Sequence, residues 1–142
     1  MTAHHGDDLV ETIMMRMVRG SNLRGYSGFK KIVDMDNYKI VRPLISYTKK
    51  EVEEYNDLNG VKYFIDATNS SDKYTRNRYR KYLLPFLKSE DINVHHKFLK
   101  FSENLNSACT FINCFAISPT FSLIFAFFLL QSFEFNEFNF GV

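Results

Sequence analysis

The chain has 142 residues, of which 45% are hydrophobic and 24% are charged, and these values exclude a disordered tail or a fibrous repeat. These whole-chain values average over two parts of different composition. All 18 Lys and Arg and 14 of the 16 acidic residues lie in residues 1–107, which therefore carry a formal net charge of +4. Residues 108–142 contain no basic residue, two Glu and 10 of the 15 Phe. We therefore expect two unlike parts, a domain portion over 1–107 and an apolar, Phe-rich tail over 108–142.

The first elements in chain order are a helix and a loop. An apolar stripe predicts a helix over residues 8–19; its members are Leu9, Ile13, Met14 and Met17. Asp8 is its expected cap, Glu11 stands in the capping-box position, and Gly20 ends it. A loop rich in glycine is expected over residues 21–29.

The middle of the chain alternates short strands with helices. Residues 38–41 alternate as a strand does, and Thr48 with Glu51 forms a capping box for a helix that Asn59-Gly60 ends. We expect a short strand or extended segment over 61–65, a turn over 66–72, and a helix over 74–84 that Pro85 ends or kinks. A further helix is expected over 94–106. This order favours an α/β fold, but two strands are too few for a complete parallel sheet, which indicates part of a domain.

The sharpest motif is the N-terminal run, in which His4, His5, Asp7 and Asp8 crowd the start of the first helix. Three interpretations are open from the chemistry alone. The run is a solvated helix cap, or a His/Asp transition-metal site as in metal-dependent phosphohydrolases, or a nucleotide site where the helix N-terminus and a magnesium ion meet phosphates.

Two basic clusters follow. Arg16, Arg19 and Arg24 surround the glycine loop, where guanidinium groups suit phosphate, although Arg16 equally fits the solvated face of the helix. The third cluster, residues 66–81, interleaves basic residues with tyrosines. That pattern suits unpaired RNA bases and phosphates, and equally a solvated basic helix face.

Taken in order, these runs resemble a known family. The motifs are His4-His5-Gly6-Asp7-Asp8-Leu9-Val10-Glu11-Thr12-Ile13, Met15-Arg16-Met17-Val18-Arg19-Gly20-Ser21, Arg42-Pro43-Leu44, and Asp66-x-x-Asn69-x-x-Asp72-x-Tyr74-Thr75-Arg76-Asn77-Arg78-x-Arg80. Over residues 2–107 the sequence resembles bacterial tRNA(Ile)-lysidine synthase, one of the N-type ATP pyrophosphatases.

The resemblance implies a partial Rossmann-like domain of the adenine nucleotide alpha hydrolase kind, with ATP and Mg²⁺ as cofactors. It implies ATP-dependent attachment of L-lysine to the wobble cytidine of the isoleucine tRNA with a CAU anticodon, through an adenylated cytidine. A homodimer in the intact family, a cytoplasmic location and no membrane partner are further expectations.

The resemblance also implies roles by position. Nucleotide binding falls to His4, His5, Asp7, Asp8 and Arg19, with Asp7 and Asp8 as metal ligands and Asp8 and Arg19 as catalytic residues. Substrate binding falls to the later motifs, at Arg42, Asp66, Asn69, Arg76, Asn77 and Arg80.

Two departures from the family matter. Its Ser-Gly-Gly-x-Asp-Ser pyrophosphate-binding loop is not in this sequence, so we expect activity only where that loop is supplied. In the tail, residues 108–130 are uncharged and long enough to cross a bilayer. Pro119 and the lack of flanking Lys or Arg favour a frameshift or gene-prediction product over a membrane anchor. The alternatives that remain are a non-catalytic RNA-binding remnant and a metal-dependent phosphohydrolase-like protein.

Overall fold

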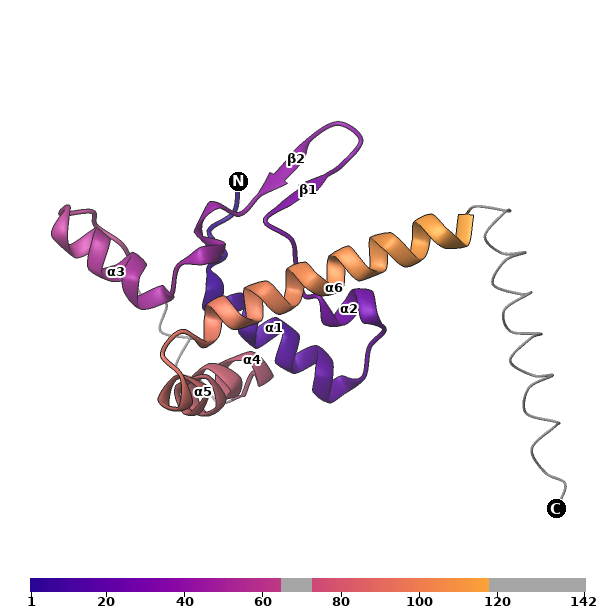
Figure 1. Cartoon of the computed structure of the whole chain (residues 1–142). Coiled ribbons are helices and arrows are strands. Elements are labelled where there is room, and N and C mark those ends of the chain that lie inside the picture. Colours follow the sequence, from indigo (N-terminus) through magenta and orange to yellow (C-terminus); the bar gives the residue numbers. More distant parts are fainter. Residues whose placement is uncertain (65–72, 118–142) are drawn as a thin grey trace, which may run out of the picture. The chain divides into compact units, whose positions relative to one another are not determined.

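Helices and one β-hairpin make up the described part of the chain. The computed structural model describes residues 1–64 and 73–117, and side chains as far as residue 113. The elements are α1 (Gly6–Arg19), α2 (Leu23–Tyr26), β1 (Ile32–Asp34), β2 (Lys39–Val41), η1 (Pro43–Ser46), α3 (Lys49–Leu58), α4 (Thr75–Arg78), η3 (Tyr79–Leu83), α5 (Leu84–Glu90) and α6 (Val94–Ile117) (Figure 1). The predicted turn over 66–72 and the tail beyond residue 117 lie outside the described residues. Contacts divide the chain into residues 1–106 and 107–142, and the site lies wholly within the first unit.

Helix α1 begins two residues earlier than predicted, because His5 and not Asp8 caps it. The His5 ring accepts a hydrogen bond from the backbone N–H of Asp8 at 3.4 Å, and the Asp8 carboxylate accepts one from the His5 N–H at 3.1 Å. This is a capping box in which Asp8 stands at the third helical position. The predicted box of Asp8 with Glu11 is therefore wrong, since both residues lie inside the helix. The Glu11 carboxylate and Oδ1 of Asp8 contact other elements instead.

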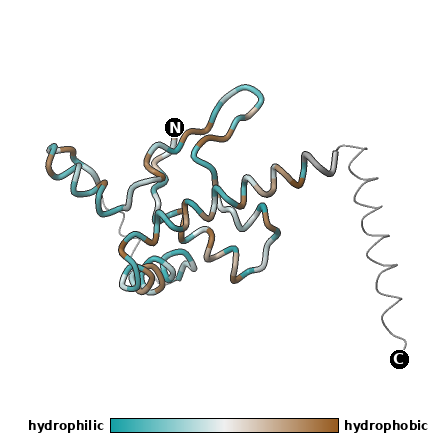
Figure 2. Tube along the Cα trace, in the orientation of Figure 1, coloured by the Kyte–Doolittle hydropathy of each residue, from teal (hydrophilic) through white to brown (hydrophobic). Residues whose placement is uncertain are grey.

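The core forms where α1 meets the segments that follow it. Leu9, Ile13 and Ile45 are buried together, and Phe29, Phe98 and Leu99 pack against them. The colouring of α1 in Figure 2 alternates between polar and apolar turns, as expected for a helix with one buried face.

The predicted loop after α1 contains the short helix α2 and is fastened to the core. The Arg16 guanidinium donates to the carbonyls of Gly25 and Gly28 at 2.7 and 2.8 Å. Gly28 has a φ of +71°, and a Cβ there would lie 2.7 Å from Leu9 Cδ1 and 2.9 Å from Ile13 Cγ1. Only glycine allows this backbone conformation at such a close approach.

The hairpin contains the predicted strand and one that the sequence analysis missed. β1 pairs antiparallel with β2, with Ile32 opposite Val41 and Asp34 opposite Lys39. The backbone N–H of Thr2 donates to the carbonyl of Val41 at 2.9 Å, which ties the N-terminus to β2. β1 has only three residues, too few for an alternation signal. Residues 61–64 do not form a strand, so of the two alternatives expected for 61–65 the strand is wrong for the described part.

A continuous helical segment passes through Pro85, where the sequence predicted an end or a kink. α4, η3 and α5 follow one another directly, and η3 is a π-helix. The N–H of Leu84 donates to the carbonyl of Tyr79, five residues back. Pro85 lies in the first turn of α5, a position that tolerates a residue without a backbone N–H. The chain continues as a helix past it, so the predicted end at Pro85 is wrong, and the alternative, a kink, stays a prediction.

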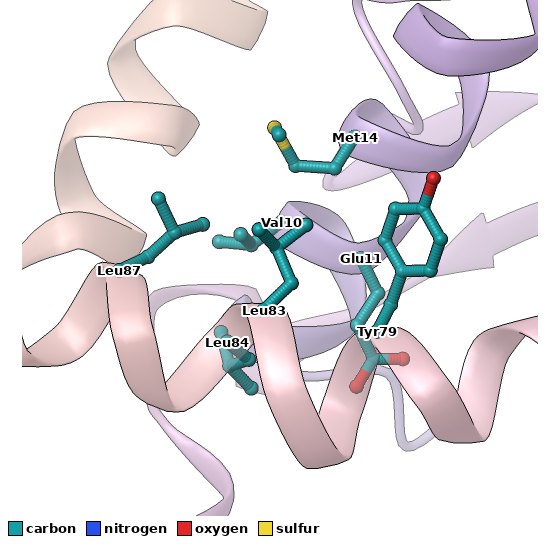
Figure 3. Close-up of a pocket in the computed structure, with 7 residues that line it drawn as sticks. All are labelled: Val10, Glu11, Met14, Tyr79, Leu83, Leu84 and Leu87. Atoms are coloured by element: carbon teal, nitrogen blue, oxygen red, sulfur yellow. The ribbon is translucent and has the colours of Figure 1, made fainter. Parts of the chain in front are cut away.

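Helix α1 packs along this segment. Figure 3 shows Val10, Glu11 and Met14 of α1 directed toward side chains of η3 and α5, and no water-sized space remains between them; the facing residues are Tyr79, Leu83, Leu84 and Leu87. The apolar contacts fix the two helices side by side, and they place the Glu11 carboxylate at the edge of the contact.

The prediction for α3 is confirmed, because Thr48 and Glu51 form the expected capping box and Gly60 has a φ of +64°. α6 starts at Val94 as predicted but extends beyond residue 106. Among the helices described, none combines the length and the apolar character needed to cross a bilayer.

His95 in the first turn of α6 makes the fold sensitive to acid. Its side chain is buried, and neither ring nitrogen has a hydrogen-bond partner within the described residues. Burial lowers the pKa of His95, helped by His96 and opposed by Glu51 and Asp7. The unfolded chain therefore binds more protons than the folded chain just below pH 6.5, and stability falls as the pH is lowered through that range.

We expect the free energy of unfolding to decrease as the pH falls below about 6.5, and His95→Phe to reduce this slope. Part of the slope remains, because burial also lowers the pKa of His5. Urea titrations at a series of pH values measure it. His96→Gln is the matched control: His96 is exposed and adds to the effect of burial on His95, so this substitution should reduce the slope less than His95→Phe does. An unchanged slope in His95→Phe contradicts the expectation.

Candidate functional site

An open pocket of about 390 Å³ lies between the N-terminus of α1 and the α4–η3 segment, lined by Ala3, His4, Asp8, Arg76, Asn77 and Arg80. Five of these six residues carry predicted site roles. The two motifs that supply them are separated by more than 60 residues in the sequence. The fold thus brings the first and the last of the sequence motifs to one place.

The floor of this region is a cluster of four charged side chains, Asp8, Glu11, Arg76 and Arg80, which we call the ion cluster. Glu11 is only 1% exposed. Its two carboxylate oxygens each accept a hydrogen bond of 2.7 Å, one from Nε of Arg76 and one from Nε of Arg80. Asp8 Oδ1 lies 3.1 Å from Nη2 of both arginines. The two guanidinium groups therefore each bridge the same two carboxylates.

Helical spacing explains why the ion cluster forms. Asp8 and Glu11 are three residues apart on α1, and Arg76 and Arg80 are four apart, so each pair shares one face of its helix. The hydrogen bond from Arg80 to Glu11 is the main cause of a raised pKa for Arg80, against the opposing effect of burial. Two positive and two negative groups leave the cluster formally neutral.

Glu11 was not among the predicted site residues, because its position after Asp8 was interpreted as a helix-capping signal. The sequence did contain a sign of its role, since Glu11 lies on the apolar face of the helix, next to Val10 and Met14. A carboxylate on such a face requires a cationic partner from another element.

Asp7 holds three elements together rather than lining the pocket. Its carboxylate is 3% exposed and lies 2.8 Å (Oδ1) and 2.9 Å (Oδ2) from Lys88 Nζ of α5. Oδ2 also accepts a hydrogen bond of 3.0 Å from the backbone N–H of Lys49, the first residue of α3. Oδ1 has no aligned hydrogen bond within the described residues, so the ammonium of Lys88 is its compensating charge. Lys88 was not predicted as part of this arrangement.

Asp7 and Asp8, as they lie, do not fit a magnesium ion. Mg²⁺ requires several oxygen ligands at about 2.1 Å in octahedral geometry, whereas these carboxylates already face Lys88, Arg76 and Arg80. The residues described include no group of three or more His, Cys, Asp or Glu arranged for a metal. The metal role of Asp7 and Asp8 stays a prediction.

The remaining predicted site residues lie in different places. The His5 ring caps α1, and its pKa is lowered chiefly by burial, which suits a neutral ring that accepts a hydrogen bond. Arg19 is exposed at the far end of α1, about 16 Å along the helix axis from Asp8. Arg42 lies over the ring of Phe29, outside the pocket lining. Asp66 and Asn69 lie outside the described residues.

We expect Arg80→Ala to lower the free energy of unfolding by about 3 kcal/mol, because it leaves the buried Glu11 carboxylate with one cation instead of two. Arg24→Ala is the matched control, since Arg24 is exposed and should change stability by less than about 0.5 kcal/mol. Urea denaturation followed by circular dichroism measures both. Equal effects of the two substitutions would show that the ion cluster does not stabilise the fold.

Comparison with known proteins gives these motifs a family. The family model described as a PP-loop domain matches residues 1–87. A tRNA(Ile)-lysidine synthase of Bacillus cereus is 50% identical over 99 residues, which cover 70% of this chain and 21% of that protein. The tRNA(Ile)-lysidine synthase of Bacillus subtilis is 45% identical over 103 residues, covering 72% and 22%.

A further relative is the bifunctional protein TilS/HprT of Listeria monocytogenes, 43% identical over 114 residues that cover 80% of this chain and 18% of that protein. The chain thus spans about a fifth of the length of these curated relatives. The match covers α1, the hairpin, α3 and the helical segment that carries Arg76 and Arg80, and so includes all the residues that line the pocket. The expected α/β fold is confirmed. The chain belongs to the PP-loop domain family and is similar to tRNA(Ile)-lysidine synthases.

Proposed function

We propose that this chain is part of a tRNA(Ile)-lysidine synthase and that the pocket beside the ion cluster binds L-lysine. The observation that carries the proposal is the meeting of the first and last motifs around one pocket, in a chain of which about 70% is 45–50% identical to part of enzymes of that name. The reaction proposed is the attachment of lysine to the wobble cytidine of the CAU-anticodon isoleucine tRNA, driven by ATP.

The charges at the pocket favour an amino acid over a polyanion. Arg76 and Arg80 point two guanidinium groups toward the pocket, but Asp8 and Glu11 neutralise them. A triphosphate therefore gains little net attraction at this point. A zwitterion can pair its carboxylate with a guanidinium and its ammonium with a carboxylate, and each such charge-assisted hydrogen bond is stronger than a neutral one. Lysine brings a carboxylate and two ammonium groups.

Within this proposal the side chains have separate tasks. Asp8 is the acidic contact for an ammonium group of lysine, because it lines the pocket while Glu11 is buried beneath it. Arg76, 40% exposed at its side chain, and Arg80, 26% exposed, receive the α-carboxylate. Asn77 adds an amide to the pocket wall. These contacts orient the amine that attacks the adenylated cytidine and displaces AMP.

The nucleotide belongs to the proposal on the strength of the PP-loop match. When bound, ATP supplies the adenylyl group that makes the cytidine C2 oxygen a leaving group. We propose that Mg²⁺ accompanies the phosphates of ATP. We also propose that Arg19 and Arg42 bind RNA or phosphate groups, and that Asp66 and Asn69 bind substrate. The tRNA partner, a homodimer and a cytoplasmic location rest on the resemblance to the family.

The metal-dependent phosphohydrolase and the non-catalytic RNA-binding remnant gain no support. The carboxylates of the first motif pair with cations, and no metal-ligand cluster is found in residues 1–64 and 73–117. No observation favours the remnant over the enzyme.

We expect the purified chain to bind L-lysine in isothermal titration calorimetry, and Asp8→Asn to weaken binding about 10- to 100-fold. That range corresponds to the loss of one hydrogen bond to a charged group, about 1.5–3 kcal/mol. Arg19→Ala should bind as the unaltered chain does, because Arg19 is remote from the pocket. Norleucine and lysine amide, which each lack one charged group of lysine, should bind more weakly than lysine.

Equal binding of lysine and norleucine would contradict the proposed site. Circular dichroism of Asp8→Asn must show a folded chain, since Asp8 also belongs to the α1 capping box. For the reaction, labelled lysine, ATP and the isoleucine tRNA are incubated with the chain and a polypeptide that carries the Ser-Gly-Gly-x-Asp-Ser loop. Label should enter the tRNA and should be lost with Asp8→Asn.

A further inference from the structure

We propose that Phe29 is a positioning residue: its ring fixes His4 in the pocket wall and holds the Arg42 guanidinium over the ring face. Phe29 belongs to none of the sequence motifs and does not line the pocket. Its ring nevertheless contacts one predicted residue from each of two motifs, His4 and Arg42. This role of Phe29 rests on the proposed function only in that L-lysine is taken as the ligand of the pocket.

The first contact concerns His4, a lining residue of the pocket. The rings of His4 and Phe29 have centroids 5.2 Å apart and planes at 63°, a T-shaped arrangement. Within the described residues, the other interaction of the His4 ring is with Thr2, whose Oγ1 lies 3.1 Å from Nδ1. Thr2 is itself held by β2, through the carbonyl of Val41, whereas Phe29 packs against the core cluster, so Phe29 is the contact that joins His4 to the core.

The second contact concerns Arg42 at the base of the hairpin. Its Cζ lies 5.0 Å from the Phe29 ring centroid, within the range of a cation–π interaction. Nη1 donates to the carbonyl of Lys30 at 2.9 Å, while Nε is buried and without a hydrogen-bond partner in the described part of the chain. The ring face and a single carbonyl therefore determine where this guanidinium lies.

Phe29 can position its neighbours because it is itself held firmly. It packs against the cluster of Leu9, Ile13 and Ile45. The preceding Gly28 lies against Leu9 and Ile13, and its carbonyl accepts the hydrogen bond from Arg16 at 2.8 Å. The backbone ahead of the ring is thus fixed to α1, the helix that also carries Asp8. Because the Phe29 ring is held in place, the His4 ring and the Arg42 guanidinium that contact it are held in place as well.

The test compares Phe29→Leu, which removes the ring but keeps an apolar side chain against the core, with Phe29→Tyr, which keeps the ring. In NMR spectra the His4 ring protons should move toward their unstructured shifts in Phe29→Leu and stay in place in Phe29→Tyr. L-lysine should bind about 3- to 10-fold more weakly to Phe29→Leu, the range of one aromatic contact. Phe29→Tyr should bind as the unaltered chain does.

A double-mutant cycle separates positioning from general loosening of the fold. In a His4→Ala background, Phe29→Leu should cause little further loss of lysine affinity, because the group that Phe29 holds is already gone. Additive losses, or unchanged His4 shifts in Phe29→Leu, overturn the inference. Should Phe29→Leu not fold, Phe29→Met is the replacement, with the same expectations. Absence of lysine binding in the unaltered chain refutes the proposed function alone, and the His4 shifts still decide the role of Phe29.

Discussion

The buried carboxylate of Glu11 and its two guanidinium partners are the interaction on which the site depends. A carboxylate 1% exposed to solvent is costly unless cations compensate it, and here both cations come from the α4–η3 segment, more than 60 residues later. The requirement to compensate that charge therefore determines where the segment packs. The apolar contacts of Val10 and Met14 with η3 and α5 support the same placement.

The same arrangement explains the chemical character of the pocket. Because Asp8 and Glu11 face Arg76 and Arg80, the floor offers alternating charges with no net excess. Asp7 is withdrawn from the pocket, since it pairs with Lys88 and with the N-terminus of α3. The three acidic residues at the start of α1, Asp7, Asp8 and Glu11, therefore have different roles. Asp8 lines the pocket, Glu11 binds both arginines, and Asp7 joins α1 to α3 and α5.

Local signals predicted the helices well and the tertiary roles poorly. The Thr48–Glu51 capping box placed α3 correctly, because a cap depends on residues next to one another. His5 as the cap of α1, the strand β1 and the passage through Pro85 were missed. The first is an uncommon cap residue, the second is too short for a pattern, and the third depends on a π turn. The sequence predicted roles for five residues that line the pocket, His4, Asp8, Arg76, Asn77 and Arg80, and those roles stay predictions. It predicted none for Glu11, Phe29 and Lys88, whose partners lie far away in the sequence.

The central claim is that the ion cluster couples α1 to the segment that carries the later motif. A double-mutant cycle of Glu11→Gln and Arg80→Gln, measured as free energies of unfolding in urea, tests it most directly. We predict a coupling energy of about 2 kcal/mol, within the range found for residues of one buried ionic network. Losses that add to within about 0.5 kcal/mol would show that Glu11 and Arg80 stabilise the chain independently, and would contradict the account.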